Sequence, residues 1–336
     1  MRASSGPLAH RDGSQAVVAL PNAAKRALAG VTGWLEGVTR GVRLASSYGS
    51  SGVFVGLTLV VAALPAFLVD PMAARAGGWF YRLDGVRQRR LRENLRVVLG
   101  PESDSREIEA AARDVYASYG RYLLEYFTMG WPDIWRRGRR VAMDTTRVAE
   151  ALRKGRGVII VSAHAANFEV AARELRRRFG PVHSAGEVMR PLWIGRVIAG
   201  IRRRAGFRVY DERNAARPLL RALAQNQVVG LAADRIVYGN GVEAVLCGRR
   251  TQVTKGPVLL ALMSGAALLP AYVRRLPRGR IQVVFGEEVP LHDLGRSAPD
   301  VATGVQRMAD AVSTAIRFGC RSWYGLHPIW GTLPHG

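Results

Sequence analysis

Cysteine is scarce in this chain of 336 residues, and the scarcity excludes two kinds of structure. Cys247 and Cys320 lie far apart and form no C-x-x-C unit, so neither a disulfide framework nor a zinc cluster is predicted. The sequence therefore fits a reducing, cytoplasmic setting. Histidines away from the central region are scattered, and no metal centre or resident cofactor is predicted; they are His10, His183, His292, His327 and His335.

Acidic residues are also few relative to basic ones. Asp and Glu number 26 against 49 Lys and Arg, giving a formal net charge of +23. Such an excess predicts anionic partners, among which phospholipid head groups, nucleic acid and acidic cofactors all qualify. With 48% hydrophobic residues, the chain can bury the core of one large α/β domain with an N-terminal extension, or of two domains at most.

Charge is absent from one long stretch, the eighteen residues from Gly52 to Val69. That length is at the threshold for a membrane span and favours membrane insertion or close attachment over a helix buried in protein. Its distance from the N-terminus argues against a removable signal peptide. Arginines that follow it, from Arg75 to Arg96, predict a cytoplasmic protein body at the cell membrane.

Three regions are expected along the chain. Residues 1–50 are predicted to be a flexible tail and lead-in, 51–130 a membrane-associated helical segment, and 131–336 an α/β domain continuous with the preceding helices. Amphipathic helices are predicted at 86–99 and 106–127, before the domain.

Short apolar strands and helices alternate from residue 158 onward, which predicts an α/β fold with a central mixed sheet flanked by helices. Strands are expected at 158–162, 182–185, 207–210, 228–232, 268–273 and 281–285. Helices are expected at 168–179, 191–205, 214–226, 255–265 and 300–317, with Asn214 as the start signal of the third.

His164 and Glu169 lie where the first of these strands gives way to a helix. Ligands of open α/β sheets bind at the carboxyl ends of strands, where a neutral histidine suits a general base. Across the bend from strand to helix, Glu169 could accept from the imidazole Nδ1–H and leave Nε2 free to take a proton. The alternative interpretation is that His164 caps the helix and Glu169 only complements the helix dipole. Spacing alone does not decide between this interpretation and a catalytic pair.

Several motifs recur in the order known from one protein family. They are the run from His164 to Glu169, Val188-Met-Arg-Pro191, Leu231-Ala-Ala-Asp-Arg235, Gly241-Val-Glu243 and the segment from Leu260 to Arg275, with Arg90-Leu-Arg-Glu-Asn-Leu95 and Trp323-Tyr-Gly-Leu-His-Pro-Ile-Trp330 at the two ends. Together they resemble the bacterial lipid A biosynthesis acyltransferases and the related mycobacterial phosphatidylinositol mannoside acyltransferases, from about Val53 to Trp330.

The resemblance implies a membrane-associated enzyme of the lysophospholipid acyltransferase type. Its donor would be an acyl thioester, acyl-CoA or acyl-carrier protein, and its acceptor a hydroxyl of a glycolipid or phospholipid. His164 would be the general base. Glu243 is a second candidate for orienting it, since the mannoside enzymes have a glutamate near their histidine in a matching segment, although an exposed strand residue is the alternative.

The acceptor stays open on this evidence. Ala166-Asn-Phe-Glu169 stands where the mannoside enzymes carry Gly-Asn-Trp-Asp. A lipid A precursor, a phosphatidylinositol mannoside, a lysophospholipid and another glycolipid are all compatible with the sequence, and the oligomeric state is not indicated.

Substrate contacts are predicted for three further residues. Asp234 and Arg235 end an apolar strand at the edge that also carries His164, and Arg235 could hold a phosphate. Arg190 precedes Pro191, in an extended turn where its guanidinium could meet an anion. Arginine clusters such as Arg176 to Arg178 and Arg202 to Arg204 favour an anionic membrane surface and an acidic donor.

Two other function classes compete with this interpretation. A nucleic-acid binder would explain the pI near 11.3, but the basic runs lack interleaved aromatics and a long uncharged segment has no role there. A non-catalytic lipid-binding homologue would keep the fold without the chemistry, against which the presence of both His164 and Glu169 argues.

Overall fold

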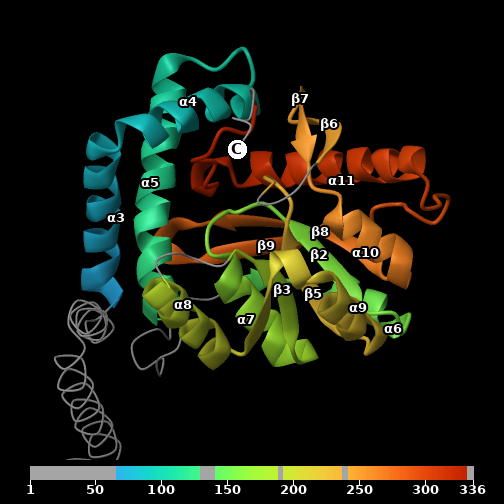
Figure 1. Ribbon diagram of the computed structural model, residues 1–336. Helices are drawn as coiled ribbons and strands as arrows, with labels where there is room; N and C mark the ends of the chain where they lie inside the picture. Colours follow the sequence, from blue (N-terminus) through green and yellow to red (C-terminus); the bar gives the residue numbers. More distant parts are fainter. Residues whose placement is uncertain (1–65, 129–140, 188–191, 237–240, 331–336) are drawn as a thin grey trace, which may run out of the picture. The chain divides into compact units, whose positions relative to one another are not determined.

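A seven-stranded mixed sheet forms the centre of the protein in the computed structural model, which describes residues 66–128, 141–187, 192–236 and 241–330 (Figure 1). The strands are β1 (Val141–Met143), β2 (Val158–Ser162), β3 (Val182–Gly186), β4 (Phe207–Asp211), β5 (Val228–Ala232), β8 (Ala267–Arg275) and β9 (Ile281–Phe285). Their order is β1-β9-β8-β2-β5-β3-β4. Neighbours are parallel except β8 and β9, which are antiparallel.

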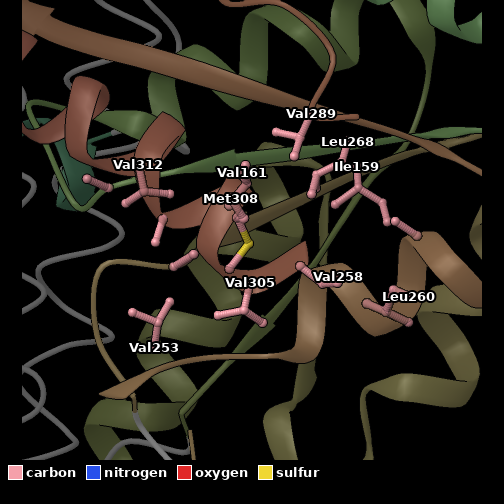
Figure 2. Packing of buried hydrophobic residues seen from close by; sticks show 14 of the residues in the cluster. Ile159, Val161, Val253, Val258, Leu260, Leu268, Val289, Val305, Met308 and Val312 are labelled. Atoms are coloured by element: carbon pink, nitrogen blue, oxygen red, sulfur yellow. The ribbon is translucent and has the colours of Figure 1, made fainter. Parts of the chain in front are cut away.

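Helices cover both faces of the sheet, because its central strands carry apolar side chains on both sides. The covering helices are α6 (Thr146–Arg153), α7 (Phe168–Phe179), α8 (Leu192–Ala205), α9 (Ala216–Ala224), α10 (Gly256–Ser264) and α11 (Ala298–Phe318). Alternation along β2 divides the core in two. Ile159 and Val161 pack with Met308 and other residues of α11 (Figure 2), whereas Ile160 belongs to a second cluster that includes Leu175 of α7.

Within the described residues before β1, the chain forms α3 (Ala66–Leu83), α4 (Gly85–Leu99) and α5 (Ser105–Thr128). Figure 1 shows α3 lying alongside α5. Their backbones approach closely at two glycines: a Cβ on Gly77 would lie 2.1 Å from the Tyr116 carbonyl oxygen, and one on Gly120 2.2 Å from that of Ala73. A core of Leu91, Leu95 and Val115 with their neighbours joins α4 to α5.

A small antiparallel hairpin stands apart from the main sheet. It consists of β6 (Val242–Leu246) and β7 (Arg249–Val253), and it is fixed to α11 by the side chain of Gln306, which bonds the backbone of Val245. Short 3-10 turns occur at Glu212–Asn214, Pro277–Gly279 and Cys320–Ser322.

The expected mixed α/β sheet with flanking helices is confirmed, and so is each expected strand. Two features differ. Asn214 does not cap a helix: it lies in a 3-10 turn, and α9 begins after Ala215 without a side-chain cap. Helix α6, strand β1 and the hairpin were not predicted; β1 has only three residues, and β7 is rich in polar residues.

The predicted tail and most of the uncharged segment, 52–65, lie outside the described residues. Its last residues, 66–69, form the start of α3, which also contains Asp70 and Pro71. Within the described part of the chain, no helix combines the length and apolar character needed to cross a bilayer.

Candidate active site

His164 and Asp234 occupy equivalent positions on two adjacent parallel strands. Ser162, the last residue of β2, is in register with Ala232, the last residue of β5. His164 and Asp234 each follow two residues after the end of their strand, and between them the Ala233 N–H donates to the Ser162 carbonyl at 2.9 Å. The pairing therefore brings His164 and Asp234 side by side at the carboxyl edge of the sheet.

Two hydrogen bonds join these residues. The His164 Nδ1 lies 2.7 Å from Asp234 Oδ1, and the His164 backbone N–H donates to Asp234 Oδ2 at 3.1 Å. Trp323 adds a third bond, from its indole Nε1–H to Asp234 Oδ2 at 2.8 Å. Both oxygens of this carboxylate are thus engaged by donors, and Asp234 is almost completely buried.

The electrostatic state of Asp234 follows from these contacts. Burial alone would raise the pKa of its carboxyl, but the charge of His164 and the hydrogen bonds from His164 and Trp323 outweigh burial and lower the pKa to about 2. At neutral pH Asp234 is a carboxylate that only accepts hydrogen bonds. The His164 Nδ1 consequently carries the hydrogen, and Nε2 keeps the basic lone pair.

A C-terminal segment holds the loop that carries His164. Ala166 has a φ of 51°, in the left-handed region, and its N–H donates to the Ser322 carbonyl at 2.8 Å. The Tyr324 N–H donates to the His164 carbonyl at 2.8 Å, and the Tyr324 hydroxyl donates to the Ala166 carbonyl. Several independent bonds therefore fix a strained turn, which presets the position of the imidazole.

Glu169 does not orient the imidazole, which corrects the expected partner of Nδ1. It lies in the first turn of α7, where its Oε1 accepts from Arg202 of α8 at 3.2 Å. Its carboxylate therefore contacts α8, and Nδ1 of His164 is bonded to Asp234 instead. Burial raises the pKa of Glu169, and Arg202, Tyr122 and His164 only partly oppose this.

Glu243 lies on the β6–β7 hairpin and is 58% exposed, with a 2.6 Å ion pair to Arg250. It forms no bond with His164, so the alternative interpretation of an exposed strand residue describes its position correctly. The catalytic contribution expected of Glu169 and Glu243 stays a prediction. Arg190 lies outside the described residues.

A cavity of about 490 Å³ begins at His164 and extends beneath α7. Its floor consists of small residues that point to this face from adjacent strands, namely Ser162, Ser184, Gly186, Gly230 and Ala232. Larger side chains, Val182, Val228 and Phe207, line it nearer the amino ends of the strands. Because the small residues leave space between the sheet and α7, this cavity has a mainly hydrocarbon lining.

Cationic side chains gather near His164. Arg235 lines the cavity, and its buried Nε makes no hydrogen bond to any described residue. Burial lowers the pKa of His327, and the charges of Arg235, Arg87, His164 and Arg90 lower it further. The surroundings of the site are therefore electropositive, as an anionic substrate group would require.

Sequence reasoning missed two roles. Trp323 belongs to the C-terminal motif, but nothing local showed that its indole would meet a carboxylate 89 positions earlier in the chain. Asp234 was predicted to contact the substrate, because it lies at the carboxyl end of a strand. The strand register that makes it the partner of His164 could not be read from the sequence.

A fixed histidine–aspartate pair beside a deep apolar cavity, at the carboxyl edge of an α/β sheet, defines an enzyme that works on substrates with hydrocarbon chains. The model of the bacterial lipid A biosynthesis acyltransferase family matches residues 40–332, and the chain belongs to that family. The protein is accordingly an enzyme of the acyltransferase class.

Named relatives fall into two groups. A phosphatidylinositol mannoside acyltransferase of Mycobacterium tuberculosis (strain CDC 1551 / Oshkosh) is 30% identical over 81% of this chain and 85% of its own length. One of Mycolicibacterium smegmatis is 29% identical over 81% and 88%. A lipid A biosynthesis lauroyltransferase of Escherichia coli K12 is 26% identical over 84% and 91%.

Proposed function

We propose that this protein is a membrane-associated O-acyltransferase that moves a fatty acyl chain from an acyl thioester to a hydroxyl of a glycolipid or phospholipid. His164 acts as the general base. The observation that carries the proposal is the 2.7 Å contact between His164 Nδ1 and the buried Asp234 carboxylate, beside the apolar cavity.

The reaction is a single displacement at the thioester carbonyl. As the acceptor oxygen attacks the carbonyl carbon, its proton passes to His164 Nε2 and a C–O bond forms. Collapse of the tetrahedral intermediate breaks the C–S bond, and the imidazolium returns the proton to the departing thiolate. Asp234 stabilises the imidazolium between these steps, because it remains ionised.

The cavity beneath α7 is suited to the acyl chain of the donor. Its small-residue floor starts next to His164, so a chain lying along it would place its carbonyl at the base. The larger side chains of Val182, Val228 and Phe207 would then limit chain length.

Arg235 is proposed to bind a phosphate of the donor or acceptor, since its guanidinium lines the cavity beside the base. Arg190 is proposed for the same class of contact. Glu169 holds Arg202 in the cavity wall through its ion pair, and this is its proposed contribution to the site. Acyl-CoA and acyl-carrier protein are the candidate donors. Both carry negative charge, which the electropositive surroundings of the site would attract.

A phosphatidylinositol mannoside is the first acceptor to test, because two relatives with that name match most of this chain. A lipid A precursor is the second, on the weaker match to the lauroyltransferase. The proposed location is the cytoplasmic face of the cell membrane, as the arginines after the uncharged segment predict.

The decisive experiment measures transfer from a labelled acyl thioester to each acceptor in detergent. We expect His164→Ala to lower the rate by a factor on the order of 10³ or more, since it removes the base. His292→Ala is a matched control, because His292 is exposed and distant in sequence from the site motifs. Equal rates for His164→Ala and the parent chain would refute His164 as the base.

A further inference from the structure

Large hydrophobic side chains are exposed mainly in one short part of the described chain. Those on α3 and at the start of α4 are Met72, Trp79, Phe80, Leu83 and Val86, each between 56% and 62% exposed. The others, Val245, Met263 and Val284, come from three separate elements. We call the five residues the α3–α4 patch.

Helix α3 presents its apolar residues outward. Residues 72, 79 and 83 lie within about 40° of one another on a helix, with residue 80 adjoining them. The opposite side carries Gly77 and the buried Tyr81, and meets α5 through the close glycine contacts. A surface helix in a water-soluble protein has the reverse arrangement, with large apolar residues inward. Small residues at the helix contact and large ones outside are the pattern of helices in contact with lipid.

Arginines surround the patch. Arg82, Arg89 and Arg90 are exposed and form no ion pair with any residue that the structure describes. Trp79 and Phe80 contact each other edge to face, with ring centroids 5.8 Å apart, so two aromatic rings stand together among these cations. Aromatic and aliphatic side chains beside arginine are typical of surfaces that enter the head-group region of an anionic bilayer.

The patch continues toward the active site along α4. Asn94 donates from its side-chain amide to the carbonyls of Gly325 at 2.8 Å and His327 at 2.7 Å. Arg90 and Arg87 lie one and two turns earlier on the same side of the helix as Asn94. The charges of Arg235 and His164 also act on His327, so α4 contacts a C-terminal segment that adjoins the site.

We infer that the α3–α4 patch docks onto an anionic lipid bilayer, with Trp79, Phe80, Leu83 and Val86 in the head-group region and the neighbouring arginines on lipid phosphates. Docking here would bring a lipid acceptor to the side of the site that faces α4. The inference names the surface through which the proposed membrane association occurs. Only the delivery of a lipid acceptor to the site rests on the proposed function; docking itself does not. A second copy of the chain is a less favourable partner for this patch, because pairing two patches would bring their surrounding arginines together and like charges repel.

The test uses the full chain with a single added cysteine, Trp79→Cys or Val245→Cys, labelled with an environment-sensitive fluorophore. The parent chain, labelled in the same way at Cys247 and Cys320, gives the background. Vesicles of phosphatidylcholine, with and without phosphatidylglycerol, are added, and brominated lipids serve as quenchers. We expect a blue shift and quenching at position 79 that grows with phosphatidylglycerol, and neither at the exposed hairpin position 245.

A binding measurement complements the fluorescence. The triple change Trp79→Ser, Phe80→Ser and Leu83→Ser should lower partitioning into anionic vesicles by about tenfold or more, whereas Val245→Ser with Val284→Ser should not. An unshifted probe at position 79 with vesicles overturns the inference. So does a shift that depends on protein concentration without lipid, which would indicate self-association.

These outcomes are separable from those of the proposed reaction, because binding is read without substrate. His164→Ala should bind vesicles as the parent chain does. If His164→Ala binds vesicles normally and also keeps full acyl transfer, the reaction mechanism is refuted and the docking surface is not affected.

Discussion

Two carboxylates near the same loop, those of Asp234 and Glu169, are buried to a similar extent, but the pKa values of their carboxyls are shifted in opposite directions. Asp234 is 3% exposed and has a lowered pKa, whereas Glu169 is 5% exposed and has a raised one. The charge of His164 and the hydrogen bonds to the charged form of Asp234 account for the difference. Asp234 receives three, from two groups of His164 and one of Trp323, while Arg202, Tyr122 and His164 only partly offset the burial of Glu169.

The comparison teaches that burial alone does not identify the partner of a catalytic histidine. A carboxylate whose negative charge is stabilised by fixed donors can support an imidazolium, and one whose pKa is raised by burial does so less well. Position in the motif next to His164 favoured Glu169, but donor geometry favours Asp234.

The largest effect is expected at Asp234. Asp234→Asn should lower the turnover number about 10³-fold or more with a small change in KM, because an amide cannot stabilise the imidazolium and favours the wrong tautomer. Steady-state transfer kinetics would measure this. A loss of less than tenfold, with the fold intact by circular dichroism, would remove Asp234 from the mechanism and reopen the comparison.

Next in size is the effect of breaking the second pair. Glu169→Gln leaves the largely buried guanidinium of Arg202 without its counter-charge and should lower the free energy of unfolding by about 3 kcal/mol. Combining it with Arg202→Met should restore most of that loss, since neither charge then remains buried. Denaturant unfolding of both single variants and the double variant provides a complete cycle. Purely additive losses would show that the two side chains are not coupled.

Trp323→Phe should have a smaller effect, which sharpens the role of the donors. Phenylalanine has no donor, so the change removes a charged hydrogen bond to Asp234 and should lower turnover about tenfold. Trp330→Phe is the matched control, because its indole donates to the Leu246 carbonyl and not to a carboxylate.

The pH dependence of stability follows from the lowered pKa of Asp234, to which the charge of His164 and the hydrogen bonds from His164 and Trp323 contribute. Asp234 has a native pKa of about 2 against an ordinary value of 3.8, so the unfolded state takes up the proton first as the pH falls. Its stabilising contribution is present above about pH 4 and is lost toward pH 2. Trp323→Phe raises the native pKa, so that contribution becomes smaller and disappears at higher pH. The measurement is the free energy of unfolding of Trp323→Phe and of Trp330→Phe from pH 2 to pH 4. Identical pH dependence in the two variants would contradict the stabilisation of Asp234 by the Trp323 indole.

The smallest effect is expected at Glu243. Because its side chain is 58% exposed and paired with the exposed Arg250, Glu243→Gln should change turnover less than about twofold and stability by less than about 1 kcal/mol. The same assays apply. Loss of turnover comparable to that of Asp234→Asn would restore Glu243 as the residue that orients the base.

Much of the fold could be predicted from local patterns. β2 and β5 are short β-branched or apolar runs, and α7 and α11 have helical spacing, so their bounds follow closely from the sequence. The hairpin could not be found this way. β7 has the sequence Arg-Arg-Thr-Gln-Val, whose polar residues give no strand signal, and it is held by pairing with β6 and by Gln306 of α11.

Within the site, the sequence by itself determined that His164 follows a buried strand and precedes a helix, which places it at the carboxyl edge of the sheet. Only the tertiary structure decided which carboxylate meets it. Asp234 is 70 positions away, and it reaches His164 because β2 and β5 pair in parallel with Ser162 opposite Ala232. Side-chain alternation specifies which face of a strand is buried but not which strand lies beside it or in what register, since these depend on contacts between distant parts of the chain. The same reason applies to α3, whose exposed apolar side is set by the close packing of Gly77 and Gly120 against the neighbouring helix.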